Sequence, residues 1–112
     1  MQDHEIEELE LSIDTAKETI AKMESVLKLA NNVDFKKVVD EGYFEKEASR
    51  LVLLKADPSL QKEEDQNAII KSIDAIGYFR QYLQTVVQLG RMAENSLQAD
   101  QQTREEIYEE AL

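Results

Sequence analysis

An uninterrupted apolar heptad repeat near the amino end is the feature that most constrains this chain. From Ile6 to Ala30, apolar residues follow one another at alternating spacings of three and four. The set is Ile6, Leu9, Ile13, Ala16, Ile20, Met23, Leu27 and Ala30. A mean spacing of about 3.5 residues keeps one stripe of a helix turned toward a partner helix along its whole length. The pattern therefore predicts a helix whose stripe is covered by another helix.

Helix-ending residues divide the rest of the chain. Asn31–Asn32 predicts the end of the first helix, because Asn tolerates the left-handed cap conformation. Asp34 is then the expected N-cap of a short helix that ends at Gly42, with a further helix up to Ala56. Pro58 blocks continuation of that helix, and Ser59 is expected to cap the next one.

The carboxyl half predicts one helix of nearly 50 residues, roughly 70 Å long at the usual rise per residue. Its stripe runs through Ile69, Ile73, Ile76, Phe79, Leu83, Val86, Gly90, Ala93 and Leu97. Gly90 and Ala93 mark a place where another helix can approach closely, and Gly77 is expected to relieve crowding where the central helix crosses.

These patterns predict a single all-α domain over residues 1–112. We expect a helical hairpin or bundle with long, coiled-coil-like amphipathic helices at both ends and short helices between them. The segments are a heptad helix at 1–31, short central helices at 34–57 and a long helix at 59–112. The stripes fit antiparallel pairing within one chain and pairing between copies equally well.

The charge balance limits the possible partners. With 24 acidic and 13 basic residues, the net charge is −11. Binding to a phosphate backbone or to anionic lipid needs clustered Lys and Arg, so direct contact with nucleic acid or membrane is not expected. A basic protein partner is compatible with this charge. Acidic clusters lie near both chain ends, and antiparallel pairing would bring them close together.

The side chains needed for catalysis or metal binding are sparse. His4 is the one histidine, and we interpret it as a solvated terminal side chain rather than as a metal ligand with Glu7 or Glu8. Cysteine is absent, and the serines have no histidine partner for a nucleophilic triad. We therefore expect no catalytic, cofactor-binding or metal-binding residue, no small-molecule substrate and no enzymatic activity.

The expected site is instead a surface for a protein partner or for a second copy of the chain. Tyr78 and Tyr82 lie one helical turn apart and form an amphipathic ridge of the kind that is favoured at interfaces. The predicted interface residues are Ile6, Leu9, Ile13, Ile20, Met23, Leu27, Tyr78 and Tyr82. Beside the apolar run Leu51–Leu54, Arg50 is expected to be partly buried and to pair with Glu47 or Asp74.

Two segments resemble small helical proteins encoded by tailed bacteriophages. Residues 35–52 read FKKVVDEGYFEKEASRLV, and the later segments read AIGYFRQYLQTVV at 75–87 and GRMAE at 90–94. The resemblance covers about Phe35 to Glu94 and leaves the heptad helix outside it. It implies a phage origin and a role near virion assembly.

Together these observations predict a non-enzymatic phage protein that acts through protein–protein contacts. It is expected to be a virion component or a scaffold- or chaperone-like assembly factor, with phage structural proteins or further copies of itself as partners. The alternative is an acidic inhibitor that imitates DNA and binds a host nucleic-acid-binding or defence protein. The amino end lacks secretory-signal features, and no apolar run is long enough to span a bilayer, so we expect a soluble protein of the host cytoplasm, the virion or both.

Overall fold

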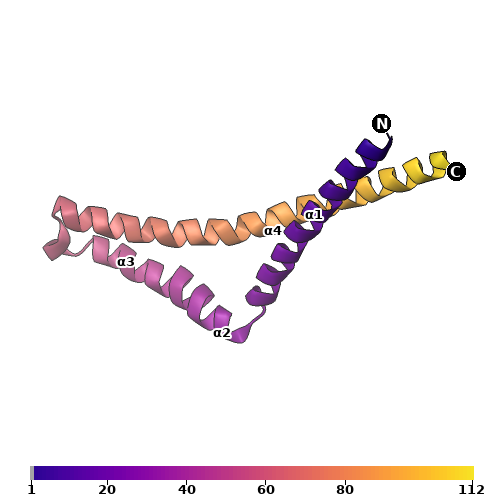
Figure 1. Ribbon diagram of the computed structural model, residues 1–112. Coiled ribbons are helices and arrows are strands. Elements are labelled where there is room, and N and C mark those ends of the chain that lie inside the picture. The colour runs from indigo at the N-terminus through magenta and orange to yellow at the C-terminus, as the bar shows by residue number, and fades with distance from the viewer. Residues whose placement is uncertain (1) are drawn as a thin grey trace. The chain divides into compact units, whose positions relative to one another are not determined.

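The computed structural model describes residues 2–112, and these are all-α, as predicted (Figure 1). Long helices at both ends flank a shorter central helical stretch. The elements are α1 (Gln2–Ala30), α2 (Val33–Phe35), η1 (Lys36–Glu47), α3 (Ala48–Lys55), η2 (Pro58–Leu60) and α4 (Glu63–Ala111). No strand occurs within these described residues.

The chain forms two compact units. The terminal unit combines Met1–Leu27 with Thr85–Leu112, and the central unit comprises Lys28–Gln84. Helix α4 contributes its first part to the central unit and its remainder to the terminal unit.

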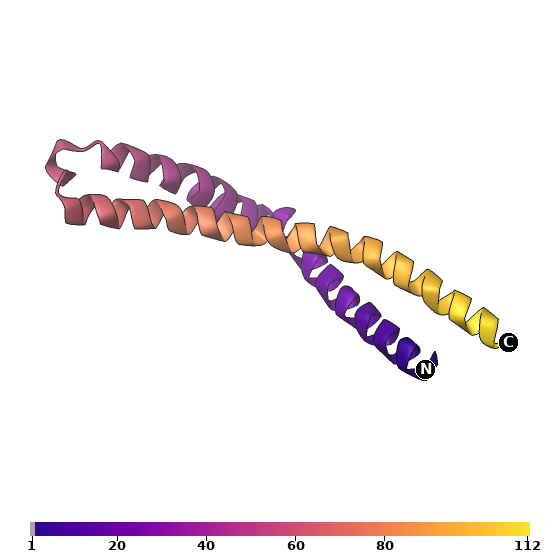
Figure 2. The ribbon, with the colours of Figure 1, turned by 90° about the horizontal axis from the view of Figure 1, so that it is seen from above.

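In the terminal unit, α1 packs antiparallel to α4 within the same chain. The Ser12 hydroxyl donates to Oδ2 of Asp100 at 2.7 Å, and the Tyr108 hydroxyl donates to Oε1 of Glu10 at 3.3 Å. Both chain ends accordingly lie at the same end of this unit (Figure 2). The buried side chains Ile13, Ala16, Met23 and Val86 all belong to the predicted stripes. The stripe of α1 is therefore covered by α4 of its own chain.

In the central unit, α3 and the first part of α4 form a helical hairpin around an apolar core (Figures 1 and 2). Leu51, Ile69 and Ile76 are buried at its centre. The partly buried residues that pack against them are Tyr43, Phe44, Ala48, Leu54, Leu60 and Ile73. Gly77 is not at a crowded crossing as predicted, because a Cβ placed there would meet no atom within 4 Å.

A hydrogen-bonded turn joins α3 to α4. Oδ1 of Asp57 accepts from the backbone N–H of Ser59 at 2.8 Å and from its hydroxyl at 2.7 Å. Asp57 is thus the N-cap of the short helix η2, because an Asp side chain readily accepts a hydrogen bond from the backbone two residues ahead. Ser59, the predicted cap of the long helix, lies inside η2, because α4 begins only at Glu63. The Nε2 group of Gln66 donates to the carbonyls of Lys55 at 2.9 Å and Leu60 at 2.8 Å, which ties the turn to α4.

The predicted break at Gly42 is wrong. Helical structure runs without interruption from Val33 to Lys55, and Gly42 lies inside η1 with no positive φ. The helix also begins earlier than predicted, because Oδ1 of Asn32 accepts from the backbone N–H of Phe35 at 3.0 Å. Asn32, not Asp34, is therefore the N-cap.

The continuous helix contains an unusual π-helical stretch, η1. A π-helix bonds residue i to residue i+5, so each turn takes up more residues than the 3.6 of an α-helix. At Gly42 a Cβ would lie 3.1 Å from the carbonyl oxygen of Lys37, so the missing side chain relieves a close contact within η1.

Candidate protein-binding surface

The predicted interface residues of α1 face α4 in the terminal unit. Ile13 is 1% exposed and Met23 is 4% exposed. The other four are half-buried, namely Ile6, Leu9, Ile20 and Leu27. These six side chains therefore hold the unit together, and a partner that used them would have to replace α4.

The two helices approach most closely at Gly90. A Cβ built on Gly90 would lie 2.6 Å from Sδ of Met23 and would overlap the Met23 Cβ. Because Cβ is fixed to the backbone, this overlap cannot be relieved by rotating the Met23 side chain alone. The prediction that Gly90 marks a close helix approach is confirmed.

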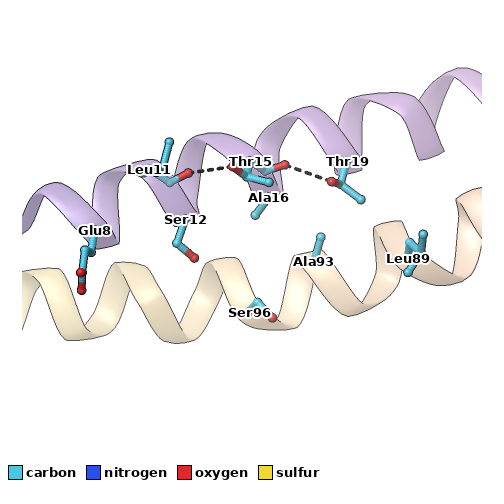
Figure 3. A pocket seen from close by; sticks show the side chains of 9 residues that line it. All are labelled: Glu8, Leu11, Ser12, Thr15, Ala16, Thr19, Leu89, Ala93 and Ser96. Carbon is cyan, nitrogen blue, oxygen red and sulfur yellow. Dashed lines mark hydrogen bonds between the residues drawn. The ribbon is translucent and has the colours of Figure 1, made fainter. Parts of the chain in front are cut away.

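An open groove of about 560 Å³ runs along one flank of this helix pair (Figure 3). It is lined by Glu8, Leu11, Ser12, Thr15, Ala16, Thr19, Leu89, Ala93 and Ser96. The lining is mainly apolar, and two large side chains are exposed in it, Leu11 at 69% and Leu89 at 49%. The hydroxyls of Thr15 and Thr19 donate within α1 to the carbonyls of Leu11 and Thr15, both at 3.0 Å. Their donors are thus already used, which adds to the apolar character of the groove.

A second, more polar groove of about 430 Å³ adjoins the first. It is lined by Glu5, Glu8, Leu9, Ser12, Asp100, Thr103 and Ile107, and it shares Glu8 and Ser12 with the apolar groove. Three carboxylates therefore lie at one end of a continuous groove. Among the described residues that line it, none is a lysine or an arginine.

The net charge of the protein is concentrated in the terminal unit. This unit has fourteen acidic and four basic residues, which gives −10 of the total −11. The central unit has ten acidic and nine basic residues and is close to neutral. Antiparallel pairing brings the two acidic chain ends together, as the hydrogen bond between Tyr108 and Glu10 shows.

The two predicted interface tyrosines lie on the surface of the central unit. Tyr78 is 68% exposed and Tyr82 is 51% exposed. The aromatic cluster is formed instead by Tyr43, Phe44 and Phe79, whose ring centroids lie 5.6–6.3 Å apart. A role of Tyr78 and Tyr82 in binding stays a prediction.

Arg50 pairs with Glu47, one of its two predicted partners. Its Nε donates to Oε2 of Glu47 at 3.0 Å, and its Nη2 also contacts that carboxylate. These hydrogen bonds lower the pKa of Glu47 and raise the pKa of Arg50. The expected burial is wrong, because the Arg50 side chain is 58% exposed and its contact with Glu47 needs only helical spacing.

The remaining residue considered in the sequence as a metal ligand is His4. Its Nε2 lies 3.0 Å from Oε1 of Glu8, and both side chains are exposed. Within residues 2–112, no group of three or more metal-ligating side chains is close enough to hold an ion. No helix in this range is long and apolar enough to cross a membrane.

Comparisons with protein-family models, with curated proteins and with solved structures found no match to this chain.

The groove residues are not predictable from the heptad pattern. Leu11, Thr15, Thr19 and Leu89 all lie off the heptad stripes, so the repeat gives no reason to select them. One sequence feature could have indicated the groove. Leu11 and Leu89 are large apolar residues at helix positions outside the heptad stripes, where solvent exposure is expected.

Proposed function

We propose that this chain is a tailed-bacteriophage protein that acts through protein–protein contacts during virion assembly. It serves as a component of the particle or as a scaffold- or chaperone-like factor, and its partner is a phage structural protein or a further copy of itself. The observation that carries this proposal is the open apolar groove on the α1–α4 pair, with Leu11 and Leu89 exposed in it. Exposed apolar side chains in such a groove gain free energy when a partner covers them.

Two further features support binding rather than catalysis. The heptad stripes are already buried against each other, so the helix pair can present its flank as a preformed surface. Tyr78 and Tyr82 add exposed amphipathic rings on the central unit, and tyrosine is enriched at interfaces. The phage origin rests on the resemblance of residues 35–94.

The test compares purified particles with infected-cell lysate by quantitative mass spectrometry, in the parent phage and in a deletion of the gene. A particle component is found at a fixed ratio to the capsid proteins. An assembly factor is found in lysate, is absent from particles, and its deletion lowers the particle yield. Normal yield without the gene, together with absence from particles, would contradict the proposal. Light scattering measures whether the purified chain self-associates.

A second function is favoured by the charge distribution. The pairing of both acidic ends in the terminal unit places −10 on one helix pair. A dense array of carboxylates can compete with phosphates for a basic groove. This acidic inhibitor would capture a host nucleic-acid-binding or defence protein, and added double-stranded DNA would displace it. Captured protein that DNA does not displace would contradict DNA mimicry.

A further inference from the structure

The groove of the terminal unit combines two kinds of surface in one line. Its longer part is apolar and contains Leu11, Ala16, Leu89 and Ala93. Its other end carries the carboxylates of Glu5, Glu8 and Asp100. An occupant therefore needs an apolar stripe along most of its length and a positive charge at one end.

The size of the apolar part indicates which structure fits it. On α1 it extends from Glu8 to Thr19, which is about three helical turns. A helix laid along such a groove presents apolar anchors at positions i, i+3 or i+4, and i+7.

Charge disfavours a second copy of the chain in this groove and favours another occupant. A second copy of the terminal unit would bring another −10 against this surface, and like charges repel at short range. A lysine- or arginine-rich helix would instead be drawn to it, because complementary charge speeds association. The electrostatic part of this attraction falls with added salt.

We propose that this groove binds a basic amphipathic helix of a partner protein. The apolar stripe of that helix packs between Leu11 and Leu89, and a lysine or arginine at one end lies beside Glu5, Glu8 and Asp100. This inference rests on the proposed function, since it specifies the chemistry of the protein partner.

The experiment measures binding of a synthetic helical peptide to the full chain by fluorescence anisotropy. The peptide has leucines at i, i+3 and i+7 and lysines at most other positions. A scrambled peptide of the same composition has no stripe and serves as its control. We expect micromolar binding of the striped peptide and at least tenfold weaker binding of the scrambled one.

Two protein variants locate the site. Leu11→Gln and Leu89→Gln are each expected to weaken binding about tenfold, because each removes a large apolar contact. The matched control is Leu53→Gln, which changes a 74% exposed leucine in the central unit and should leave binding unchanged. Glu5→Gln should weaken binding a few-fold at low salt and have little effect at high salt. Circular dichroism confirms that each variant remains helical.

The outcomes separate this inference from the proposed function. Equal affinity for both peptides, or no effect of Leu11→Gln and Leu89→Gln, would overturn the basic-helix site. The proposed function would still stand if the chain is found in particles or if its deletion lowers their yield. Suppose instead that the peptide binds through Leu11 and Leu89, but that the chain is absent from particles and its deletion leaves their yield unchanged. The basic-helix site would then stand, and the assembly role would be overturned.

Discussion

The terminal unit and the central unit bury their apolar side chains in different ways. The terminal unit relies on a long stripe of aliphatic and small residues, with Gly90 at its closest point. The central unit packs aromatic rings and isoleucines, and it widens one helix into the π-helical turns of η1. The first arrangement leaves a long open flank, whereas the second surrounds buried Leu51, Ile69 and Ile76 with partly buried side chains.

Charge follows the same division. The terminal unit carries −10 and the central unit −1. The unit with the groove is therefore also the one that attracts cationic partners. In the proposed function, the terminal unit therefore supplies the groove and the central unit supplies the exposed Tyr78 and Tyr82.

The largest expected effect is loss of packing in the terminal unit. Ile13→Ala removes the most deeply buried side chain and should lower stability by about 3 kcal/mol, through lost burial and a cavity. Native-state hydrogen exchange reports each unit separately, and the loss should be seen in α1. Leu11→Ala, on the same helix but 69% exposed, is the control and should change stability by less than about 0.5 kcal/mol. Equal effects would show that α4 does not cover the α1 stripe.

The next comparison uses one glycine from each unit. Gly77→Ala should raise stability by about 1 kcal/mol, because alanine favours a helix and the new methyl group meets nothing within 4 Å. Gly90→Ala should lower it by about 1 kcal/mol, because overlap with Met23 costs more than the helix propensity gained. Thermal unfolding of both variants measures whether each substitution raises or lowers the stability. Stabilisation by both would contradict close approach at Gly90.

An effect of similar size is expected at the start of the central helical stretch. Asn32→Ala removes the side-chain cap on the Phe35 N–H and should cost about 1 kcal/mol. Asp34→Ala keeps that cap and should cost only a few tenths of a kcal/mol, through its interaction with the helix dipole. Urea unfolding measures the free energy of unfolding of both variants and shows which substitution costs more. A larger loss for Asp34→Ala would restore Asp34 as the cap.

The smallest effect is a pH dependence in the central unit. Hydrogen bonds from Ser59 lower the pKa of Asp57, so its carboxylate stabilises the fold at neutral pH. That contribution is fully present above the ordinary pKa of an Asp and is lost as pH falls below about 4. Asp57→Asn should therefore reduce stability at pH 7 and reduce it less at pH 3, as measured by urea unfolding. An equal reduction at both values would assign the effect to geometry rather than to charge.

The long helices and their buried faces are predictable from the sequence, because they depend on local spacing. Ile13, Ala16, Met23 and Val86 all lie on the predicted stripes, and all are buried. The π-helical stretch η1 is not marked in the sequence, because its partly buried residues Val39, Tyr43 and Glu47 follow one another at spacings of four, as in an α-helix.

The groove escapes prediction for another reason. It depends on how α1 and α4 rotate against each other, and a heptad pattern defines the contact face but not the flanks. Pairing of α1 within the chain is equally undetermined by the sequence, because identical stripes serve both arrangements. The structure shows pairing within the chain through contacts between residues far apart in the sequence, such as the hydrogen bond between Ser12 and Asp100.

The close approach of α1 and α4 at Gly90 has a consequence for the alignment of the two helices. A heptad stripe looks the same after a slide of seven residues, so the stripe alone permits several alignments. Such a slide along α4 would move Met23 from Gly90 to Leu97, where a branched side chain replaces the missing one. The missing side chain at Gly90 therefore opposes such a slide, and it determines which residues of α1 and α4 lie opposite each other.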